Sequence, residues 1–235
     1  PFWGTRGFGR YQMSSGYGPY ALNRLCSESK GIYLIANEGK GAKFNQAVMR
    51  GYRPDYRPIR MYVKDLEKNL AKRSLVRAAT LTREKRIPVL GLTFNAENDN
   101  VLRRVVTEAQ KPVAELDFRL KQLQFELEAG EAERGKLTQP RWQAGFDLAL
   151  GRVLAMRVRA FGYNVVLAQM KSQPKVFQKK DSNIWRLKAD REITSGGAVK
   201  KLHKKAREYL NRVVDQHAGT PWALLAEREL STPMG

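Results

Sequence analysis

The chain has 235 residues, of which 42% are hydrophobic and 28% are charged. That balance excludes an intrinsically disordered chain, and the length is enough to bury a core without disulfides or metals. The net charge of +20 predicts an electrostatic field that attracts nucleic acids, anionic lipids or acidic proteins. No run approaches the roughly 18 consecutive apolar residues that a transmembrane helix needs, so we expect no membrane span.

Two features of the sequence bear on the compartment. The single cysteine, Cys26, excludes an internal disulfide and leaves both the cytoplasm and the periplasm open. The sequence begins Pro1-Phe2-Trp3, with neither an initiator methionine nor a charged-then-apolar leader. We therefore expect the native N-terminus, and any targeting signal, to lie further upstream.

The first 40 residues predict a small α/β unit. Residues 1–18 are rich in Gly and aromatic residues and are expected to be loop. A helix is expected from Pro19 to Lys30, since Pro suits a first helical position and Gly31 follows as a stop signal. The apolar run from Ile32 to Ala36 then predicts a short buried strand.

Part of this unit carries a resemblance to a known family. The residues that carry it are Ser15-Gly16-Tyr17-Gly18-Pro19-Tyr20-Ala21-Leu22, Leu25-Cys26 and Gly31-Ile32-Tyr33-Leu34-Ile35. They resemble the last helix and strand of a von Willebrand factor type A domain, as found in large bacterial proteins. In that family the metal sits on an Asp-x-Ser-x-Ser loop near the start of the domain. This chain has none of the family's metal-binding positions, so the resemblance implies no metal ligand here.

A basic stretch rich in Gly and Pro, residues 41–57, is predicted to link residues 1–40 to a helical domain at residues 58–235. Residues 56–235 also resemble the uncharacterised helical region that follows the type A domain in the same bacterial proteins. The first helix of the domain is expected from Ile59 to Glu84. An extended segment, Val89 to Phe94, follows.

Two long amphipathic helices form the predicted centre of the domain, one from about Asn98 to Ala129 and one from Pro140 to about Gln169. Their caps are expected at Asn95 or Asn98 and at Thr138. Pro112 lies inside the first and predicts a kink or a split. Because only a short polar turn separates the two helices, they should form an antiparallel hairpin.

The end of the chain predicts a small β-hairpin and two helices. Val176-Phe177 and Ile184-Trp185-Arg186-Leu187 flank the turn sequence Asp181-Ser182-Asn183. Ser195 is expected to cap a helix that ends near Gln216, and Thr220 with Pro221 starts a short helix through Leu230. The joint between these helices resembles the joint between helices of tetratricopeptide repeats, although no 34-residue period recurs. The predicted fold class is mainly α, with long antiparallel helical hairpins, a small β-hairpin and one preceding α/β unit.

No constellation in the sequence supports catalysis or metal binding. Cys26 is expected to be a buried core thiol, and His203 lies among lysines that depress its pKa, with no carboxylate to orient it. His217 falls in the last turn of its helix, where a cation suits the helix dipole. A solvated helix end accounts for the remaining acidic cluster, which comprises Glu126, Glu128, Glu131 and Glu133. We therefore predict neither an enzyme nor a cofactor.

Positive charge is concentrated in two segments. Residues 40–86 carry 14 Lys and Arg against 4 Asp and Glu, and residues 171–207 carry 12 against 3. Residues 97–134 carry 6 Lys and Arg against 9 Asp and Glu, so this helix is acidic. A basic surface could therefore dock on this helix within the protein, or it could bind a partner. The candidate interaction surface comprises Lys175, Lys179, Lys180, Trp185, Arg186, Lys200, Lys201, Lys204 and Lys205.

Two functions stay open from the sequence. The first is a non-catalytic interaction or scaffold region that docks a protein partner through helix faces. The alternative is nucleic-acid binding through segments 40–86 and 171–207, mostly by phosphate contacts. Phe177 and Trp185 would then form a stacking platform for single strands, unless both pack the hairpin onto the helices.

Overall fold

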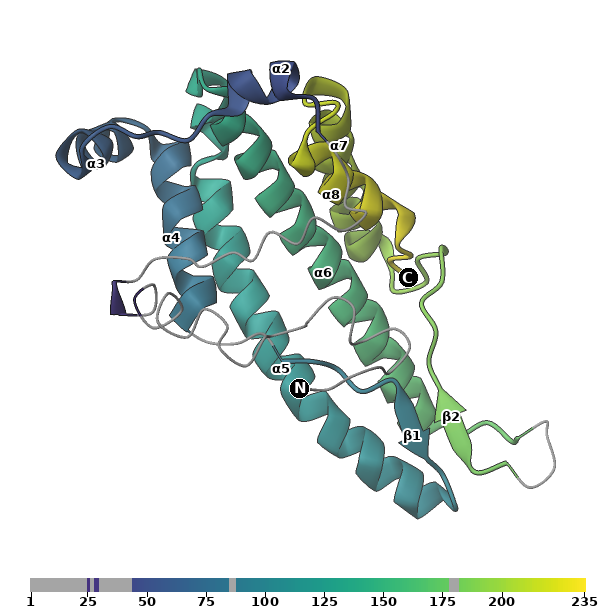
Figure 1. Cartoon of the computed structure of the whole chain (residues 1–235). Helices are drawn as coiled ribbons and strands as arrows, with labels where there is room; N and C mark the ends of the chain where they lie inside the picture. Colours follow the sequence, from purple (N-terminus) through teal and green to yellow (C-terminus); the bar gives the residue numbers. More distant parts are fainter. Residues whose placement is uncertain (1–24, 26–27, 30–43, 85–87, 178–181) are drawn as a thin grey trace, which may run out of the picture. The chain divides into compact units, whose positions relative to one another are not determined.

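The computed structural model describes residues 25, 28, 29, 44–84, 88–177 and 182–235 (Figure 1). Helices account for 72% of these residues and strands for 3%, which confirms a mainly α fold. The chain divides into two compact units, Pro1–Lys43 and Phe44–Gly235. In the first, Leu25 and Glu28 are helical, and the amide of Ser29 donates to the carbonyl of Leu25. Cys26 and the predicted strand from Ile32 to Ala36 lie outside the described residues.

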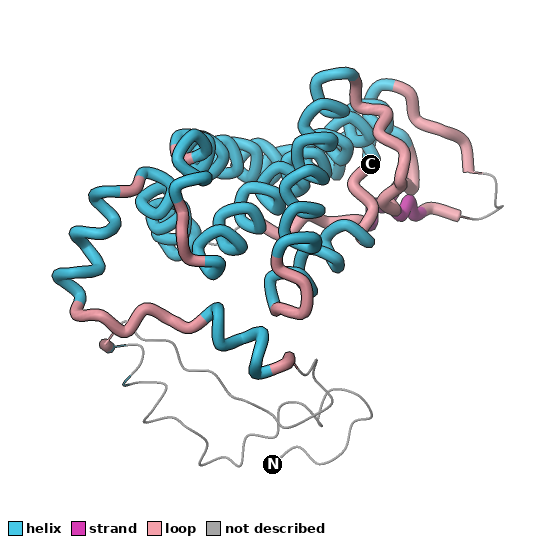
Figure 2. The backbone as a smooth tube through the Cα atoms, turned by 90° about the horizontal axis from the view of Figure 1, so that it is seen from above, coloured by secondary structure: helices cyan, strands magenta, loops and turns pink. Residues whose placement is uncertain are grey.

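The second unit includes residues 44–57, part of the predicted linker, and is built on long packed helices. Its elements are α2 (Gln46–Met49), η1 (Arg50–Tyr52), α3 (Ile59–Lys68), α4 (Leu70–Glu84), β1 (Thr93–Asn95), α5 (Asp99–Ala129), η2 (Glu131–Lys136), α6 (Pro140–Ser172), β2 (Ile184–Arg186), α7 (Gly197–Gln216) and α8 (Pro221–Ser231). Figures 1 and 2 show α5 and α6 side by side, with α4 against α5 and with α7 and α8 against α6. This arrangement makes α6 the central helix.

The predicted hairpin of two long helices is confirmed, and its apolar stripes form the core. The largest fully buried side chains at the centre are Leu120, Leu127, Leu137, Phe146, Leu150, Leu154 and Leu210. Each contributes about 1.5–3 kcal/mol by burial, so tertiary packing stabilises these helices far more than intrinsic propensity does. At the α6–α7 contact Gly151 lets α7 approach closely, since a Cβ there would lie 2.9 Å from Cγ of Leu210.

The prediction of a single helix from Ile59 to Glu84 is wrong, because the helix is interrupted at Asn69. Asn69 has an extended backbone, with φ −133° and ψ 112°, between α3 and α4. Its side-chain oxygen accepts the amide of Lys72 at 2.9 Å, and the amide of Leu70 donates to Glu133 at 2.6 Å. These two acceptors satisfy the first free amides of α4, which makes a helix start here favourable.

The predicted caps are partly correct. Asn98 caps α5 and Thr220 caps α8, as expected. Of the kink or split predicted at Pro112, the split is absent, since α5 runs through this residue without interruption. The caps at Thr138 and Ser195 are also wrong, because Gln139 precedes α6 and Gly196 precedes α7, each without a side-chain cap. Gly196 enters its helix with φ +101°, a conformation that suits a residue without a side chain.

The predicted β-hairpin within residues 174–188 is wrong, because β2 pairs with a strand distant in sequence. β1 and β2 are antiparallel, with Phe94 opposite Trp185. Phe94 is buried in a second apolar cluster that also contains Leu102 and Leu167. The sheet therefore closes the end of the α5–α6 hairpin, and burial of Phe94 there selects β1 as the partner.

Candidate functional site

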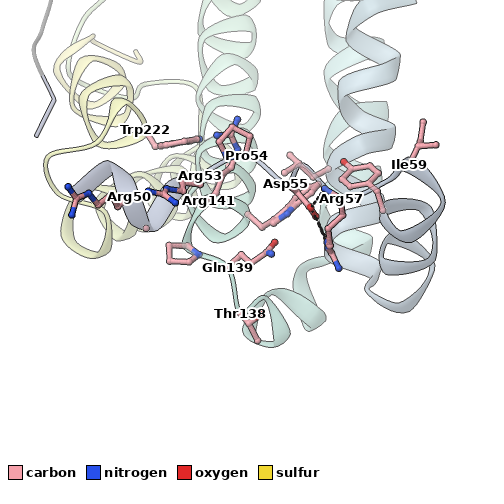
Figure 3. Close-up of a pocket in the computed structure, with 16 residues that line it drawn as sticks. Arg50, Arg53, Pro54, Asp55, Arg57, Ile59, Thr138, Gln139, Arg141 and Trp222 are labelled. Carbon is pink, nitrogen blue, oxygen red and sulfur yellow. Dashed lines mark hydrogen bonds and ion pairs between the residues drawn. The ribbon is translucent and has the colours of Figure 1, made fainter. Parts of the chain in front are cut away.

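A cleft of about 780 Å³ opens in the second unit beside the first turn of α6 (Figure 3). One side comes from η1, the following loop and α3, and the other side comes from α6, with single contributions from α4 and α8. Its charged lining residues are Arg50, Arg53, Arg57, Arg141 and Asp55, and its larger apolar ones are Ile59, Tyr62, Leu75, Trp142 and Trp222. We call it the arginine cleft, because four arginines face a single acid there.

Tyr52 anchors the part of the wall that carries Arg50 and Arg53. Its side chain is buried, and its hydroxyl lies 2.8 Å from Nδ1 of His217. Its ring stacks on Trp222 with a centroid distance of 5.5 Å. Because Tyr52 is held on both sides, the backbone that carries the two neighbouring arginines is fixed in place.

Three arginines give the cleft its available positive charge. Arg50 and Arg53 are exposed, and no carboxylate lies within ion-pair distance of either among the residues that the structure describes. Arg141 donates to the carbonyl of Tyr52 at 3.1 Å and lies over the ring of Trp222 at 5.4 Å. Figure 3 shows Arg53 and Arg141 close to Trp222, whereas the side chain of Arg50 points away from them. An anionic group entering the cleft can therefore receive several charge-assisted hydrogen bonds.

The fourth arginine, Arg57, is neutralised within the protein. Its Nε and Nη2 donate to the two carboxylate oxygens of Asp55 at 2.9 and 2.6 Å, and Nη2 also lies 3.2 Å from Asp65. The hydrogen bonds from Arg57 lower the pKa of Asp55 to about 2. Asp65 in turn binds the ammonium of Lys72 at 2.5 Å. This end of the cleft is thus a closed network of charges.

The aromatic rings of the cleft are already engaged by neighbouring side chains. The ring of Trp142 has the ammonium of Lys72 at 5.4 Å and the ring of Tyr62 at 6.1 Å. Trp222 contacts Tyr52 and Arg141, as described above. These rings therefore act as walls and leave little free ring face for a stacking base.

The start of α6 adds to the positive field. Pro140 is its first residue, no side chain caps it, and its first turn contains no acid. Free amides and the helix dipole both favour negative charge at such an end. Gln139, Pro140 and Arg141 line the cleft, so the dipole acts at its rim.

The structure separates the residues of the predicted interaction surface. Lys175, Trp185 and Arg186 lie on or next to β2, near the C-terminal end of α6, whereas the four later lysines lie on α7. Lys179 and Lys180 lie outside the described residues. On α7 the exposed members are Lys200, Lys201 and Lys204. Lys205 instead binds Glu128 and Glu131, each at 3.0 Å.

The rings of Phe177 and Trp185 stack on each other, with centroids 4.6 Å apart and an interplanar angle of 18°. Both are half-buried against the second apolar cluster. Both rings therefore pack against the protein, which is the alternative to a stacking platform for single-stranded nucleic acid.

The acidic cluster spans the end of α5 and the start of η2, and the prediction that it is a solvated helix end is wrong. Glu131 accepts the hydroxyl of Tyr209, and with Glu128 it binds Lys205 of α7. Glu133 accepts the first amide of α4, and Glu126 lies 3.8 Å from Arg77 of α4. The cluster therefore docks α4 and α7 onto α5 and η2.

His217 lies at the C-terminal cap of α7, where a cation suits the helix dipole, but burial disfavours its charged form. The side chain is buried, its Nδ1 faces the hydroxyl of Tyr52, and its buried Nε2 has no hydrogen-bond partner. Burial lowers the pKa of His217, the nearby Asp147 raises it and Arg134 lowers it. Burial and Arg207 lower the pKa of His203, which is half-buried rather than fully solvated.

Acid is expected to destabilise the second unit through His217. Its native pKa lies below its unfolded value, so the unfolded state binds more protons as the pH falls below about 6.5. Stability is then full above that pH and falls, by at most about 1.4 kcal/mol per pH unit, down to the native pKa. Urea unfolding at a series of pH values measures this slope. His217→Gln should flatten most of it and His203→Gln should leave most of it, whereas an unchanged slope in His217→Gln would contradict the assignment.

Most of the cleft could not be predicted from the sequence. Arg50, Arg53 and Arg57 lie in the basic segment 40–86, but no local pattern joins them to Arg141 and Trp222.

Among the described residues, no group of three or more His, Cys, Asp or Glu is arranged to hold a metal ion. Within the same part of the chain, every helix is too short or too polar to cross a membrane. Comparisons of the chain with protein-family models, with curated proteins and with solved structures give no match.

Proposed function

We propose that this chain is a non-catalytic interaction region of a von Willebrand type A-like protein and that it binds an acidic segment of a partner protein in the arginine cleft. One observation carries the proposal: Arg50, Arg53 and Arg141 line one cleft, and no carboxylate of the described residues pairs with them. Arginine forms bidentate hydrogen bonds with carboxylates, and those bonds are stronger than neutral ones.

The mixed lining favours a polypeptide over a small anion. Arg50, Arg53 and Arg141 line the cleft together with the apolar side chains of Ile59, Leu75 and Trp142. A segment that alternates Glu or Asp with large apolar residues can contact both kinds of side chain. Buried apolar anchors would then supply affinity, and the charges would supply orientation and fast association.

Nucleic acid fits the cleft less well. Bases need free ring faces, and both indole rings of the cleft already have neighbours. The exposed lysines of α7 retain a basic face, but they lie on a different element from the cleft. Nucleic-acid binding is therefore the alternative to peptide binding, and the experiment described next distinguishes the two.

The test uses fluorescence anisotropy with a labelled peptide of Glu-Glu-Leu repeats as the probe. Arg50→Glu combined with Arg53→Glu should weaken binding by about 100-fold or more, because each of the two charge-assisted contacts is worth about 1.5 kcal/mol. Lys200→Glu combined with Lys204→Glu makes the same change in net charge away from the cleft. This control should retain the affinity within a few-fold.

Equal losses in the two double variants would contradict the proposal, because they would mean that only net charge matters. All four substituted side chains are exposed, so the variants should unfold at the wild-type urea concentration. If a single-stranded oligonucleotide bound tightly and lost affinity only with the α7 variant, the alternative would replace the proposal.

A further inference from the structure

A second cavity, of about 350 Å³, lies between α7, the end of α8 and the loop that precedes α7. Its nitrogen donors are the side chains of Arg191 in the loop and of His203 and Arg207 on α7. Ser231 and Thr232 at the end of α8 add hydroxyl groups, and the rest of the lining is apolar. None of the described residues that line it is acidic. We call it the α7–α8 cavity.

Backbone hydrogen bonds hold the loop that carries Arg191 against the end of the chain. The amide of Asp190 donates to the carbonyl of Gly235 at 2.8 Å, and the amide of Gly235 donates to the carbonyl of Asp190 at 2.9 Å. The carboxylate of Asp190 accepts the amides of Arg191 and Glu192 at 2.5 and 3.1 Å. Figure 1 accordingly shows the C-terminus beside this loop. The backbone of Arg191 is therefore fixed at the cavity.

The donors of the cavity are not used within the protein. Arg191 and Arg207 are exposed, and no described carboxylate lies within ion-pair distance of either guanidinium. His203 is half-buried, and its ring makes no hydrogen bond within the described part of the chain. It precedes Arg207 by one helical turn, and burial and Arg207 both lower its pKa. A bound anion would relieve this concentration of positive charge.

The negative end of the α8 dipole also lies at this cavity, but its acceptors are already occupied. Arg159 of α6 donates to the carbonyls of Pro233 and Thr232 at 3.0 and 3.4 Å. Glu229, the acid of the last turn of α8, is bound by Arg159 and by Arg152. These groups therefore do not neutralise Arg191 and Arg207.

The hydroxyl groups of the cavity are acceptors. Ser231 and Thr232 each donate their proton to the carbonyl of Arg228 at 2.8 Å. Their oxygens keep lone pairs, which can accept hydrogen bonds from hydroxyl groups of a ligand. The volume is at the lower end of the range for small-molecule sites, roughly 300–1,000 Å³. The cavity thus suits a small ligand that carries both an anionic group and hydroxyl groups.

We propose that the α7–α8 cavity binds a small phosphate monoester with a hydroxylated carbon chain. A phosphate has three free oxygens, enough to accept hydrogen bonds from both arginines and from His203, whereas a carboxylate has two. Ser231 and Thr232 would accept from the hydroxyl groups of the carbon chain. The cavity shares no residue with the arginine cleft, so this site is independent of the proposed function.

Isothermal titration calorimetry with glycerol 3-phosphate tests the site. Arg191→Gln combined with Arg207→Gln should weaken binding by about 100-fold, because each charge-assisted contact contributes about tenfold. Arg103→Gln combined with Arg104→Gln removes the same charge from exposed positions on α5 and should retain the affinity within a few-fold. Inorganic phosphate should bind more weakly than glycerol 3-phosphate, and glycerol should not bind.

Three results of the titration would overturn the proposal. They are the absence of glycerol 3-phosphate binding, equal losses in the two double variants, and binding of a single-stranded oligonucleotide in preference to glycerol 3-phosphate. All four substituted arginines are exposed, so each variant should unfold at the wild-type urea concentration.

Proton NMR locates the ligand without any variant in the cavity. The chain has two histidines, and His203→Gln assigns their ring resonances. Saturation with glycerol 3-phosphate should raise the pKa of His203 by about one unit or more, because a dianion beside the ring favours its charged form. The resonances of His217, which is buried and does not line the cavity, should titrate as before. An unchanged pKa of His203, or an equal change at both histidines, would contradict binding in the α7–α8 cavity.

Discussion

Asp147→Ala is expected to lower the free energy of unfolding by about 3–5 kcal/mol, the typical cost of removing one partner from a buried ion pair. Asp147 is 0% exposed, and its Oδ2 lies 2.5 Å from Nη2 of Arg134. Its Oδ1 lies 3.5 Å from Arg212 of α7. Without the carboxylate, two guanidinium groups would face each other across the contact of η2, α6 and α7.

Urea unfolding of Asp147→Ala and of Asp147→Asn measures this effect. The isosteric Asn variant should also be destabilised, because it keeps the shape but loses the negative charge. Glu108→Ala serves as the control, since it breaks an exposed pair with Lys111 and should cost less than about 1 kcal/mol. If Asp147→Ala also cost less than about 1 kcal/mol, the ion pairs of Asp147 with Arg134 and Arg212 would not be what holds η2, α6 and α7 together.

Gly130→Val is expected to destabilise the fold by about 3 kcal/mol, at the upper end of the usual cost of overpacking. Gly130 ends α5, and a Cβ there would lie 2.8 Å from Cα of Ala71 and 2.9 Å from Cβ of Ser74. A backbone atom cannot be moved by a change of rotamer, so α4 as a whole would have to shift. Since α4 carries Leu75 of the cleft, the shift should also alter peptide binding.

The same substitution at Gly135 provides the matched control. A Cβ at Gly135 meets no atom within 4 Å, so Gly135→Val should stay within about 0.5 kcal/mol of the wild type. Unfolding midpoints in urea compare the two variants directly. Equal midpoints would contradict the close approach of α4 to the end of α5.

Local patterns predicted the central helical hairpin because burial there follows the helical period. Leu120, Leu127, Phe146 and Val153 recur at helical spacing, and each lies in the core. The break at Asn69 escaped prediction because the apolar stripe continues on both sides of it. Its cause is partly tertiary, since Glu133 accepts the first amide of α4 from 63 residues away.

Long-range contacts account for the other errors. The turn sequence at Asp181-Ser182-Asn183 favoured a local hairpin, whereas Phe94 is buried where it pairs opposite Trp185. The candidate cleft needs Arg53, Arg141 and Trp222 together, and only the packing of η1 and α8 against α6 joins them. Charge counts located the basic segments but could not distinguish a lysine that docks internally, such as Lys205, from one that faces solvent.

A competition experiment tests most directly whether the arginine cleft binds acidic polypeptide. The labelled Glu-Glu-Leu peptide is bound at physiological salt and then displaced by either the unlabelled peptide or a single-stranded oligonucleotide of equal charge. We expect the peptide to be the stronger competitor and expect Arg50→Glu with Arg53→Glu to remove the difference between the two. If the oligonucleotide competed better than the peptide, or if the cleft variant bound the peptide like the wild type, the proposed function would be contradicted.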